Sequence, residues 1–219
     1  PKNYDPVSLE TEWVSGAAVA IRTSCFQKIG GFESKIFMYG EDVDLSWRLR
    51  CAGFKLAYVP WAAVVHHTYC HENEIKPLQS IESIYVNLCL RTRYSGHRSI
   101  LQGLAMALAE LLTPESFPGR RKAILLAVFR FLKNYRYFRK THHSRDDFEP
   151  RFIGWGYEIR RDGAFHKFLS KDQWGHIHLP LISVLIRAHN RPGFLMEALK
   201  TVARQTWPNL EVVVVEDGS

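Results

Sequence analysis

Two strand-like runs, with a segment of helical periodicity between them, constrain the fold of this chain more than any other feature. Residues 181–186 are apolar apart from Ser183, and residues 210–215 form a second run rich in valine. Between them, from position 192 to 207, apolar residues recur at helical spacing. Short apolar runs of this kind are typical of buried parallel strands. Residues 180–219 are therefore predicted to form a β-α-β unit, which places the chain in the α/β class.

The carboxyl ends of these two strands are the expected ligand-binding edge of the sheet, because α/β sheets bind ligands there. No G-x-G-x-x-G and no phosphate-binding loop follows the first strand, which disfavours dinucleotide-binding and ATPase functions. Asp217 directly follows the second strand. It could accept hydrogen bonds from a nucleotide's ribose or base, or it could form an Asx turn or a helix N-cap.

The first ninety residues alternate short strand and helix signals. A strand is predicted over residues 16–21, and short extended segments over 54–60 and 62–67. The run EDVDLSWRLRCAG predicts a helix that ends at Gly53, with Leu45, Leu49 and Ala52 on one face. Acidic residues crowd its first turn, where they suit the positive end of the helix dipole.

Glu41 and Asp42 open that helix, and two roles are compatible with them. They could serve only helix-end electrostatics, or Asp42 could be a general base that takes a proton from an attacking hydroxyl. The dipole is expected to keep Asp42 ionised at neutral pH. His66 and His67 could hold a single catalytic cation or be surface histidines; a closed zinc site is not indicated, because the preceding residues read as a strand.

Positive charge is concentrated in one segment. Residues 91–140 hold eleven Lys and Arg against two Glu, while the whole chain has a net charge of +7. Helices are predicted over residues 91–150 with a break at 113–119, followed by a connector at 151–179. In AILLAVFRFLKNYRYFRK basic and apolar residues interleave, which suits a linker helix with a solvated basic face or a helix on an anionic membrane surface. No nucleic-acid-binding motif accompanies the charge, so we expect no nucleic acid partner.

Composition excludes several classes of protein. Aromatic residues make up 13% of the chain, so disorder is not expected. The four cysteines include no C-x-x-C pair, which argues against a disulfide framework or a zinc ribbon and favours a reducing compartment. No apolar stretch reaches the ~20 residues of a membrane span. The first residue is Pro1 and the last is Ser219 directly after a strand-like run, so we expect a piece of a longer protein.

Two long motif strings resemble one enzyme family. Residues 14–67, from VSGAAVAIR through GGFESKIFMYGEDVDLSWRLRCAGFKLAYVPWAAVVHH, resemble the later half of a family 2 glycosyltransferase domain. PLISVLIRAHNRPGFLMEALKTVARQTWPNLEVVVVEDGS resembles the opening of another such domain. The resemblance thus implies two partial GT-A (Rossmann-like) half-domains joined by a basic α-helical linker. The corresponding divisions are 1–90, the C-terminal half of a first domain; 91–179, the linker and connector; and 180–219, the N-terminal β-α-β of a second.

The resemblance also implies an activity and its residues. The family transfers a sugar from a nucleotide-sugar donor to a hydroxyl acceptor, with inversion and with Mg²⁺ or Mn²⁺. Carried over, Asp42 would be the catalytic base, assisted by Glu41, and one of His66 and His67 would lie near the diphosphate and metal. Nucleotide binding would fall to the carboxyl edge of the second half-domain, that is to Arg187, His189, Glu216 and Asp217.

The run IRAHN departs from the family, which more usually has a Pro-Thr-Tyr-Asn-like sequence at that place. The metal-binding Asp-x-Asp motif is also absent at a strand end, since Asp42-Val43-Asp44 lies at a helix start. We therefore expect the segment alone to be inactive. The resemblance implies that the full protein builds bacterial surface polysaccharide or glycan. It would act in the cytoplasm, either free or peripherally at the inner membrane face, on a glycan or lipid-linked acceptor.

Three alternatives remain from the sequence. The chain could be a non-catalytic module that docks an assembly to a membrane or a partner. It could belong to a nucleotidyltransferase, which can share a similar nucleotide-binding sheet. In a geometric alternative, residues 180–219 would pack against residues 1–90 as a permuted single domain.

Overall fold

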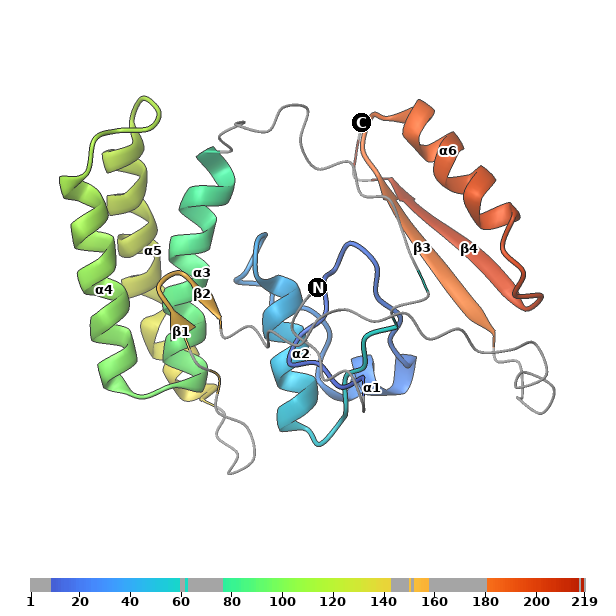
Figure 1. Cartoon of the computed structure of the whole chain (residues 1–219), viewed down its shortest axis with the longest axis horizontal. Coiled ribbons are helices and arrows are strands. Elements are labelled where there is room, and N and C mark those ends of the chain that lie inside the picture. The colour runs from blue at the N-terminus through green and yellow to red at the C-terminus, as the bar shows by residue number, and fades with distance from the viewer. Residues whose placement is uncertain are drawn as a thin grey trace. The chain divides into compact units, whose positions relative to one another are not determined.

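The computed structural model describes residues 9–59, 62, 77–142, 150, 152–157, 181–216 and 218. The chain divides into two compact units, residues 1–167 and 168–219, and each is described by itself. The first unit is mainly helical, whereas the second is a small α/β unit (Figure 1).

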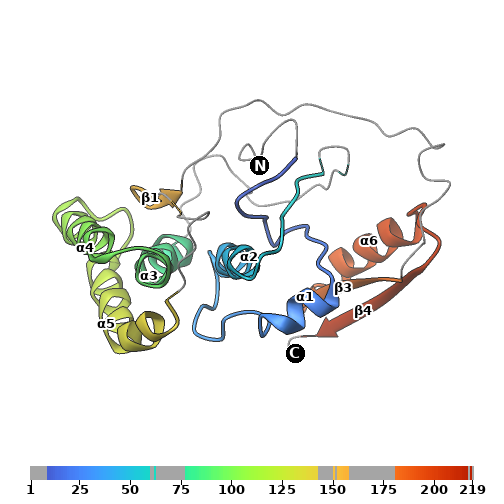
Figure 2. The ribbon, with the colours of Figure 1, turned by 90° about the horizontal axis from the view of Figure 1, so that it is seen from below.

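Five helices make up most of the first unit. They are α1 (Thr23–Lys28), α2 (Glu41–Cys51), α3 (Pro77–Tyr94), α4 (His97–Leu112) and α5 (Arg120–Lys140). The helix α3 packs most extensively against α5 and also against α4, and Figure 2 shows these three helices grouped together with α2 beside α3. The predicted helix after Gly40 and the break at 113–119 are confirmed. The helical region nevertheless begins earlier than predicted, because α3 starts at Pro77.

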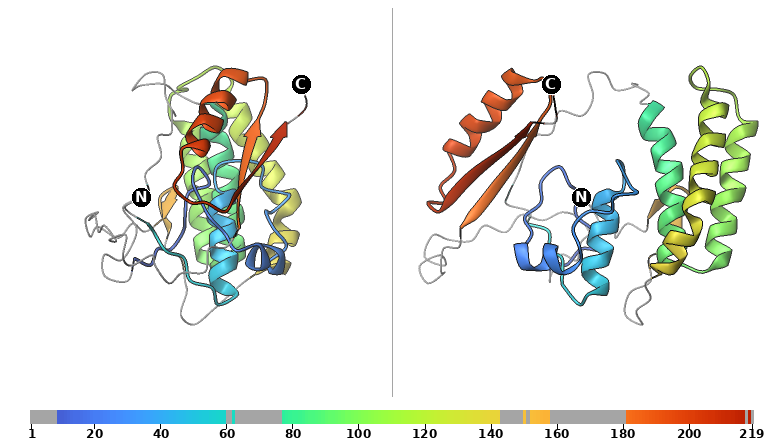
Figure 3. Two further views of the ribbon diagram at one scale, coloured as in Figure 1. Left: turned by 90° about the vertical axis from the view of Figure 1, so that its right-hand side faces the viewer. Right: turned by 180° about the vertical axis from the view of Figure 1, so that it is seen from behind.

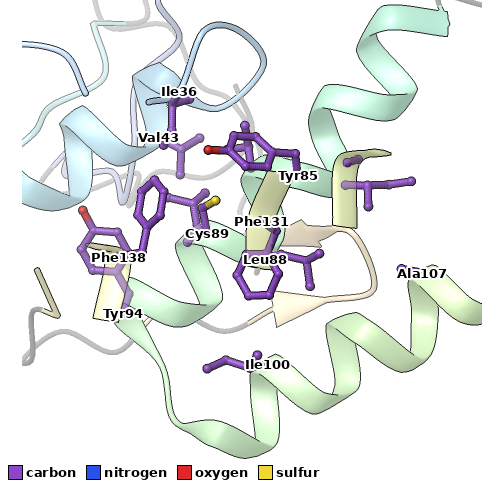
Figure 4. Close-up of a cluster of buried hydrophobic side chains, with 14 of the residues drawn as sticks. Ile36, Val43, Tyr85, Leu88, Cys89, Tyr94, Ile100, Ala107, Phe131 and Phe138 are labelled. Carbon is purple, nitrogen blue, oxygen red and sulfur yellow. The ribbon is translucent and has the colours of Figure 1, made fainter. Parts of the chain in front are cut away.

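The core of this unit lies where α2, α3, α4 and α5 meet. Figure 4 shows that α3 supplies its centre through Tyr85, Leu88 and Cys89, all of them fully buried. The other helices each add apolar side chains, namely Val43 and Trp47 from α2, Ile100 and Ala107 from α4, and Ile124, Phe131 and Phe138 from α5. On α2 the predicted apolar face is buried at Leu45 and Leu49, while Ala52 is exposed because it follows the last helical residue.

A buried guanidinium joins these elements by charge. Arg93 on α3 is 1% exposed and donates to Asp44 of α2 at 2.6 Å and to Glu33 at 2.6 Å. It also donates to Thr141, the residue that caps α5, and lies over the ring of Phe138. Burial opposes ionisation of Glu33, but the hydrogen bonds and charge of Arg93, together with hydrogen bonds from the Lys35 N–H and the Tyr137 hydroxyl, lower the pKa of that carboxyl. The stability that Glu33 adds is therefore present at neutral pH and is lost on acidification.

A short hairpin covers one end of α3. The strands β1 (Phe152–Ile153) and β2 (Gly156–Tyr157) pair antiparallel across a turn at Gly154, in a region expected to be an irregular connector. Arg91 donates to the Gly154 carbonyl at 2.7 Å, and Asn87 donates to the Trp155 carbonyl at 3.1 Å. Both side chains come from α3, so the hairpin belongs to the first unit.

The strand predicted over residues 16–21 is wrong. These residues form a turn and irregular backbone, followed by the short helix α1. The backbone N–H of Gly16 donates to the Asp42 side chain instead of joining a ladder. The extended character predicted near residue 57 is confirmed in a minimal form, because Ala57 forms an isolated antiparallel bridge with Glu10.

The second unit is the predicted β-α-β. It consists of β3 (Ile182–Ala188), α6 (Pro192–Ala203) and β4 (Leu210–Glu216), with the two strands parallel from Ile182 opposite Leu210 to Ala188 opposite Glu216. The helix α6 contacts β3 and lies over one face of the sheet (Figure 3).

The expected burial of these strands is wrong within this chain. Leu185 is 71% exposed, and the four valines of β4 are each at least 40% exposed. Along β3 the exposed residues alternate with the partly or fully buried Val184, Ile186 and Ala188. The reason is that α6 packs on one face of β3 and has little contact with β4, so the other face of β3 and both faces of β4 lack a covering layer in the described unit.

Removing the buried guanidinium should destabilise the first unit strongly. Arg93→Met leaves Asp44 and Glu33 as buried carboxylates without their main partner, which costs about 3–5 kcal/mol in comparable buried pairs. Urea unfolding measures the loss. Arg98→Met, at an exposed position of α4, should change the unfolding free energy by less than about 0.5 kcal/mol. Equal stability of the two variants would contradict the role given to Arg93.

The close approach of α3 and α4 makes Gly103 intolerant of a side chain. A Cβ there would lie 2.8 Å from Leu88 Cδ2 and 2.9 Å from Arg91 Cδ, both of them buried. Gly103→Ala should therefore destabilise by about 1–3 kcal/mol, although alanine is the better helix former. Thermal unfolding followed by circular dichroism tests this. The matched change Gly193→Ala on α6 meets nothing within 4 Å and should not destabilise.

Candidate functional site

The candidate site of the first unit is built around the start of α2. Tyr39 and Gly40 precede the helix with φ values of 64° and 141°, and the latter lies in the region that favours glycine. The Asp44 N–H donates to the Gly40 carbonyl at 3.0 Å and closes the first helical turn. The Glu41 carboxylate turns back and accepts a hydrogen bond from the Gly40 N–H at 3.0 Å. Glu41 thus holds the turn that presents Asp42.

Asp42 is held by two backbone donors from different parts of the chain. Its Oδ2 accepts from the Gly16 N–H at 2.9 Å, and its Oδ1 accepts from the Val43 N–H at 2.8 Å. The segment that carries Gly16 is itself attached to α2, because the Val14 N–H donates to Ser46 Oγ at 3.1 Å. The carboxylate is half-buried and is therefore oriented without being closed off from solvent.

Burial sets the proton affinity of Asp42. Desolvation raises its pKa, the Gly16 N–H opposes this, and the neighbouring charge of Glu41 raises it further, so the pKa lies above its ordinary value. A carboxylate with a raised pKa is a stronger base, provided that the working pH keeps it ionised. The position therefore suits a group that accepts a proton from a substrate hydroxyl.

Asp44 has a different task, although it lies only two residues along the same helix. It is fully buried and accepts from Arg48 at 2.8 Å, from Arg93 at 2.6 Å and from the Tyr94 hydroxyl at 3.0 Å. Its oxygens are occupied by these donors, so Asp42-Val43-Asp44 does not act as a metal-binding pair. Nor do the described residues contain any group of three or more His, Cys, Asp or Glu that could hold a metal ion. The described part of the chain thus does not fit a divalent cation.

The second candidate site is the carboxyl edge of the β3–β4 sheet. Arg187 and His189 are exposed there, and Arg187 is opposite Val215 in the parallel register. Glu216 is opposite Ala188, so its side chain projects from the other face of the sheet than that of Arg187. The Glu216 carboxylate accepts a hydrogen bond from the Asn190 N–H at 3.3 Å, which links the ends of the two strands. This edge therefore carries a cation, an imidazole and a hydrogen-bonded carboxylate, with Arg187 and Glu216 on opposite faces of the sheet.

Three of the residues named from the sequence are not among those described. His66, His67 and Asp217 lie outside the described residues, so their proposed roles stay predictions. The sequence, in turn, did not indicate the contact between Gly16 and Asp42. The glycine itself was visible, but its run resembled a strand, and nothing local pointed to a carboxylate 26 positions away.

Comparisons with known proteins match two segments of the chain, and each segment contains one of the two candidate sites. Residues 8–95 match a family model described as "Glycosyltransferase like family 2", and residues 183–219 match "Glycosyl transferase family 2". The matches support an assignment to glycosyltransferase family 2, whose domains have a GT-A, Rossmann-like α/β fold. The small parallel sheet with its helix agrees with that fold. No solved structure matches the chain significantly.

Several curated relatives share segments with the chain. An N-acetylglucosaminyl-diphospho-decaprenol L-rhamnosyltransferase of Mycobacterium tuberculosis is 46% identical over 66 residues, which are 30% of this chain and 22% of the relative. Rhamnosyltransferase WbbL of Escherichia coli is 40% identical over 62 residues, 28% of this chain and 23% of the relative. A pre-mycofactocin glycosyltransferase of M. tuberculosis is 30% identical over 120 residues, 53% of this chain and 25% of the relative. The chain thus spans about a quarter of the length of these relatives.

Asp42 and Asp44 should respond oppositely to loss of charge. Asp42→Asn keeps an acceptor for the Gly16 N–H and removes a charge whose burial is unfavourable, so stability at pH 7 should be unchanged or higher. Because the folded pKa of Asp42 is raised, any advantage of the variant should shrink as the pH falls through that pKa and the wild-type carboxyl becomes neutral. Chemical denaturation at pH 7 and at lower pH measures this difference.

Asp44→Asn is the matched control on the same helix. It leaves Arg93 and Arg48 facing a neutral amide and should be clearly destabilising at pH 7. If Asp42→Asn destabilised as much as Asp44→Asn, the two carboxylates would share a structural role, against the division described above.

Proposed function

We propose that the chain is part of a glycosyltransferase that moves a sugar from a nucleotide-sugar donor to a hydroxyl acceptor with inversion. The observation that carries the proposal is Asp42, a half-buried carboxylate with a raised pKa, fixed by Gly16 at the start of α2 within a segment that matches family 2.

In the proposed reaction Asp42 acts as the general base. The acceptor hydroxyl attacks the anomeric carbon, its O–H proton passes to the Asp42 carboxylate, and the new C–O bond forms as the bond to the diphosphate oxygen breaks. The nucleoside diphosphate leaves with the electron pair of that bond. Glu41 assists by holding the turn before α2, where its carboxylate bonds the Gly40 N–H. Attack opposite to the leaving group inverts the anomeric centre.

The second half-domain would bind a nucleotide of its own, separate from the donor of the reaction at Asp42. We assign it to the carboxyl edge of the β3–β4 sheet, with Arg187, His189, Glu216 and Asp217 as its contacts. Exposure of Arg187 and His189 at that edge and the family 2 match of residues 183–219 support this assignment. One of His66 and His67 would lie near the diphosphate of the first segment.

The order of the segments supports a tandem arrangement. A stretch that resembles the later half of a catalytic domain precedes one that resembles the opening of such a domain, and the two lie in different compact units. Residues 1–90 and 180–219 would then belong to two domains of one polypeptide, joined by the basic helical segment 91–179. The permuted single domain has less support, since residues 16–21 form no strand for the sheet to extend.

The acceptor is proposed by analogy with the relatives. The name of the M. tuberculosis relative specifies a sugar acceptor linked through diphosphate to decaprenol. We propose for this protein a glycan or lipid-linked acceptor in bacterial surface polysaccharide synthesis, at the cytoplasmic face of the membrane. Family 2 enzymes generally use a divalent metal, Mg²⁺ or Mn²⁺. Since the described residues do not fit such an ion, no step above depends on it.

The first test is release of nucleoside diphosphate from a panel of nucleotide sugars with Mn²⁺ and candidate acceptors. It uses the longest gene product that contains this chain, with the 219-residue chain assayed in parallel and expected to be inactive. Asp42→Asn should lower acceptor-dependent release by about 10²–10⁴-fold, because the proton then has no base. Glu197→Gln, an exposed change on α6, should leave release unaltered.

Each other outcome has a definite meaning. Release that survives Asp42→Asn would exclude Asp42 as the base of the measured reaction. Release of pyrophosphate instead of nucleoside diphosphate would identify a nucleotidyltransferase. If the whole panel gave no product with glycan and lipid-linked acceptors present, the proposed transfer would be rejected in favour of a non-catalytic docking role.

A further inference from the structure

The outer face of α5 combines exposed apolar side chains with positive charge. The inner face of the helix packs on α3 through Ile124, Phe131 and other residues of the core. On the opposite side four large apolar side chains are each more than half exposed: Leu125, Leu126, Phe129 and Leu132. Spacings of four and three residues place Leu125, Phe129 and Leu132 in one row along the helix. The row has no covering element in the described unit.

Basic residues flank this row toward both ends of the helix. The helix α5 contains eight Lys and Arg and no acidic residue. Arg120 and Arg130 form ion pairs with Glu110 of α4 and Glu82 of α3, respectively. Five others are exposed and form no ion pair with any described residue: Arg121, Lys122, Lys133, Arg136 and Lys140. Lys133 also lies over the Phe129 ring, with its Nζ 5.0 Å from the ring centroid.

The helix α4 shows that this combination is specific to α5. Leu101, Leu108 and Leu112 are even more exposed than the leucines of α5. Yet α4 holds a single Arg and a single Glu, so its apolar row has no net positive border. The two helices therefore offer apolar rows of similar kind that differ in charge.

We propose that the outer face of α5, defined by Leu125, Phe129 and Leu132 with their basic border, docks on an anionic lipid bilayer surface. A helix with a large apolar side and a polar side rich in Lys and Arg lies in the headgroup region, with its apolar residues among the acyl chains. Each Lys or Arg near an anionic leaflet strengthens binding about fivefold. None of the described helices is long and apolar enough to cross a membrane, and this mode of binding requires no crossing.

Other binding partners would account for either the basic or the apolar residues of this face, but not for both. A nucleic acid would pair with the basic residues but would gain nothing from a row of leucines. A protein partner would cover the leucines, but lysines are depleted from protein interfaces. An anionic bilayer accounts for both groups together, because its headgroups carry the opposite charge and its acyl chains accept the apolar side chains.

Vesicle flotation with the 219-residue chain tests the proposal. We expect binding to vesicles of phosphatidylglycerol and phosphatidylcholine, at least tenfold weaker binding to phosphatidylcholine alone, and weakening in 1 M NaCl, where charges are screened within ~3 Å. The triple variant Leu125→Gln, Phe129→Gln, Leu132→Gln should lose on the order of a hundredfold in binding, roughly fivefold for each half-exposed side chain withdrawn from water. Lys122→Gln with Lys133→Gln should lose about 25-fold at low salt.

The matched control is Leu101→Gln with Leu108→Gln on α4, which should weaken binding by less than threefold. All substituted positions are exposed, so circular dichroism should show the same folded structure for every variant. Equal binding of wild type and the triple variant, or equal loss in the α4 control, would overturn the proposal. A third result would also overturn it: no vesicle binding by the wild type, together with a change of oligomeric state in the triple variant, measured by light scattering. The face would then be an interface between protein chains. The assay contains no nucleotide sugar, so its failure is distinct from a failure of the proposed transfer.

Discussion

The Arg93 guanidinium is the interaction on which the rest of the first unit depends. Charges are costly to bury unless hydrogen bonds replace the water that they lose. Arg93 meets this condition through Asp44, Glu33 and Thr141, which belong to α2, to the loop before it and to the end of α5. One side chain of α3 thus fixes three segments that apolar packing alone would allow to slide, because apolar contacts have no preferred direction.

This arrangement explains how one short helix serves two purposes. The first turn of α2 exposes Asp42 on the side where Gly16 approaches, while Asp44 is turned into the interior. The buried carboxylate is saturated with donors and holds the helix in place. The half-buried one keeps unshared capacity to accept a further proton or hydrogen bond. Rigid support behind a partly open functional group is what proton transfer at a defined atom requires.

The sequence was sufficient to predict the secondary-structure features that depend on neighbouring residues. The helix after Gly40, the break at 113–119 and the parallel β-α-β were foreseen because periodicity and Gly or Pro signals are local. Prediction from the sequence failed where contacts between residues far apart in the chain determine the structure. Arg93 meets Asp44 across 49 positions, and the partner of Gly16 is a side chain and not a strand. For the same reason the strands of the second unit looked buried, since their composition reveals nothing about which layers cover them. Of the predicted site residues, Glu41 and Asp42 could be placed together from sequence because they are adjacent.

The position of Thr141 has a consequence for the dynamics of the first unit. This residue caps α5, and its hydroxyl accepts hydrogen bonds from the Arg93 guanidinium. The same guanidinium extends from α3 to the first turn of α2. Fraying of the end of α5 breaks the hydrogen bonds between Arg93 and Thr141, and a shift of α2 breaks the ion pair between Arg93 and Asp44. Amide protons in α2, the end of α3 and the last turns of α5 should therefore exchange with solvent through one shared opening event, as a single cooperative unit.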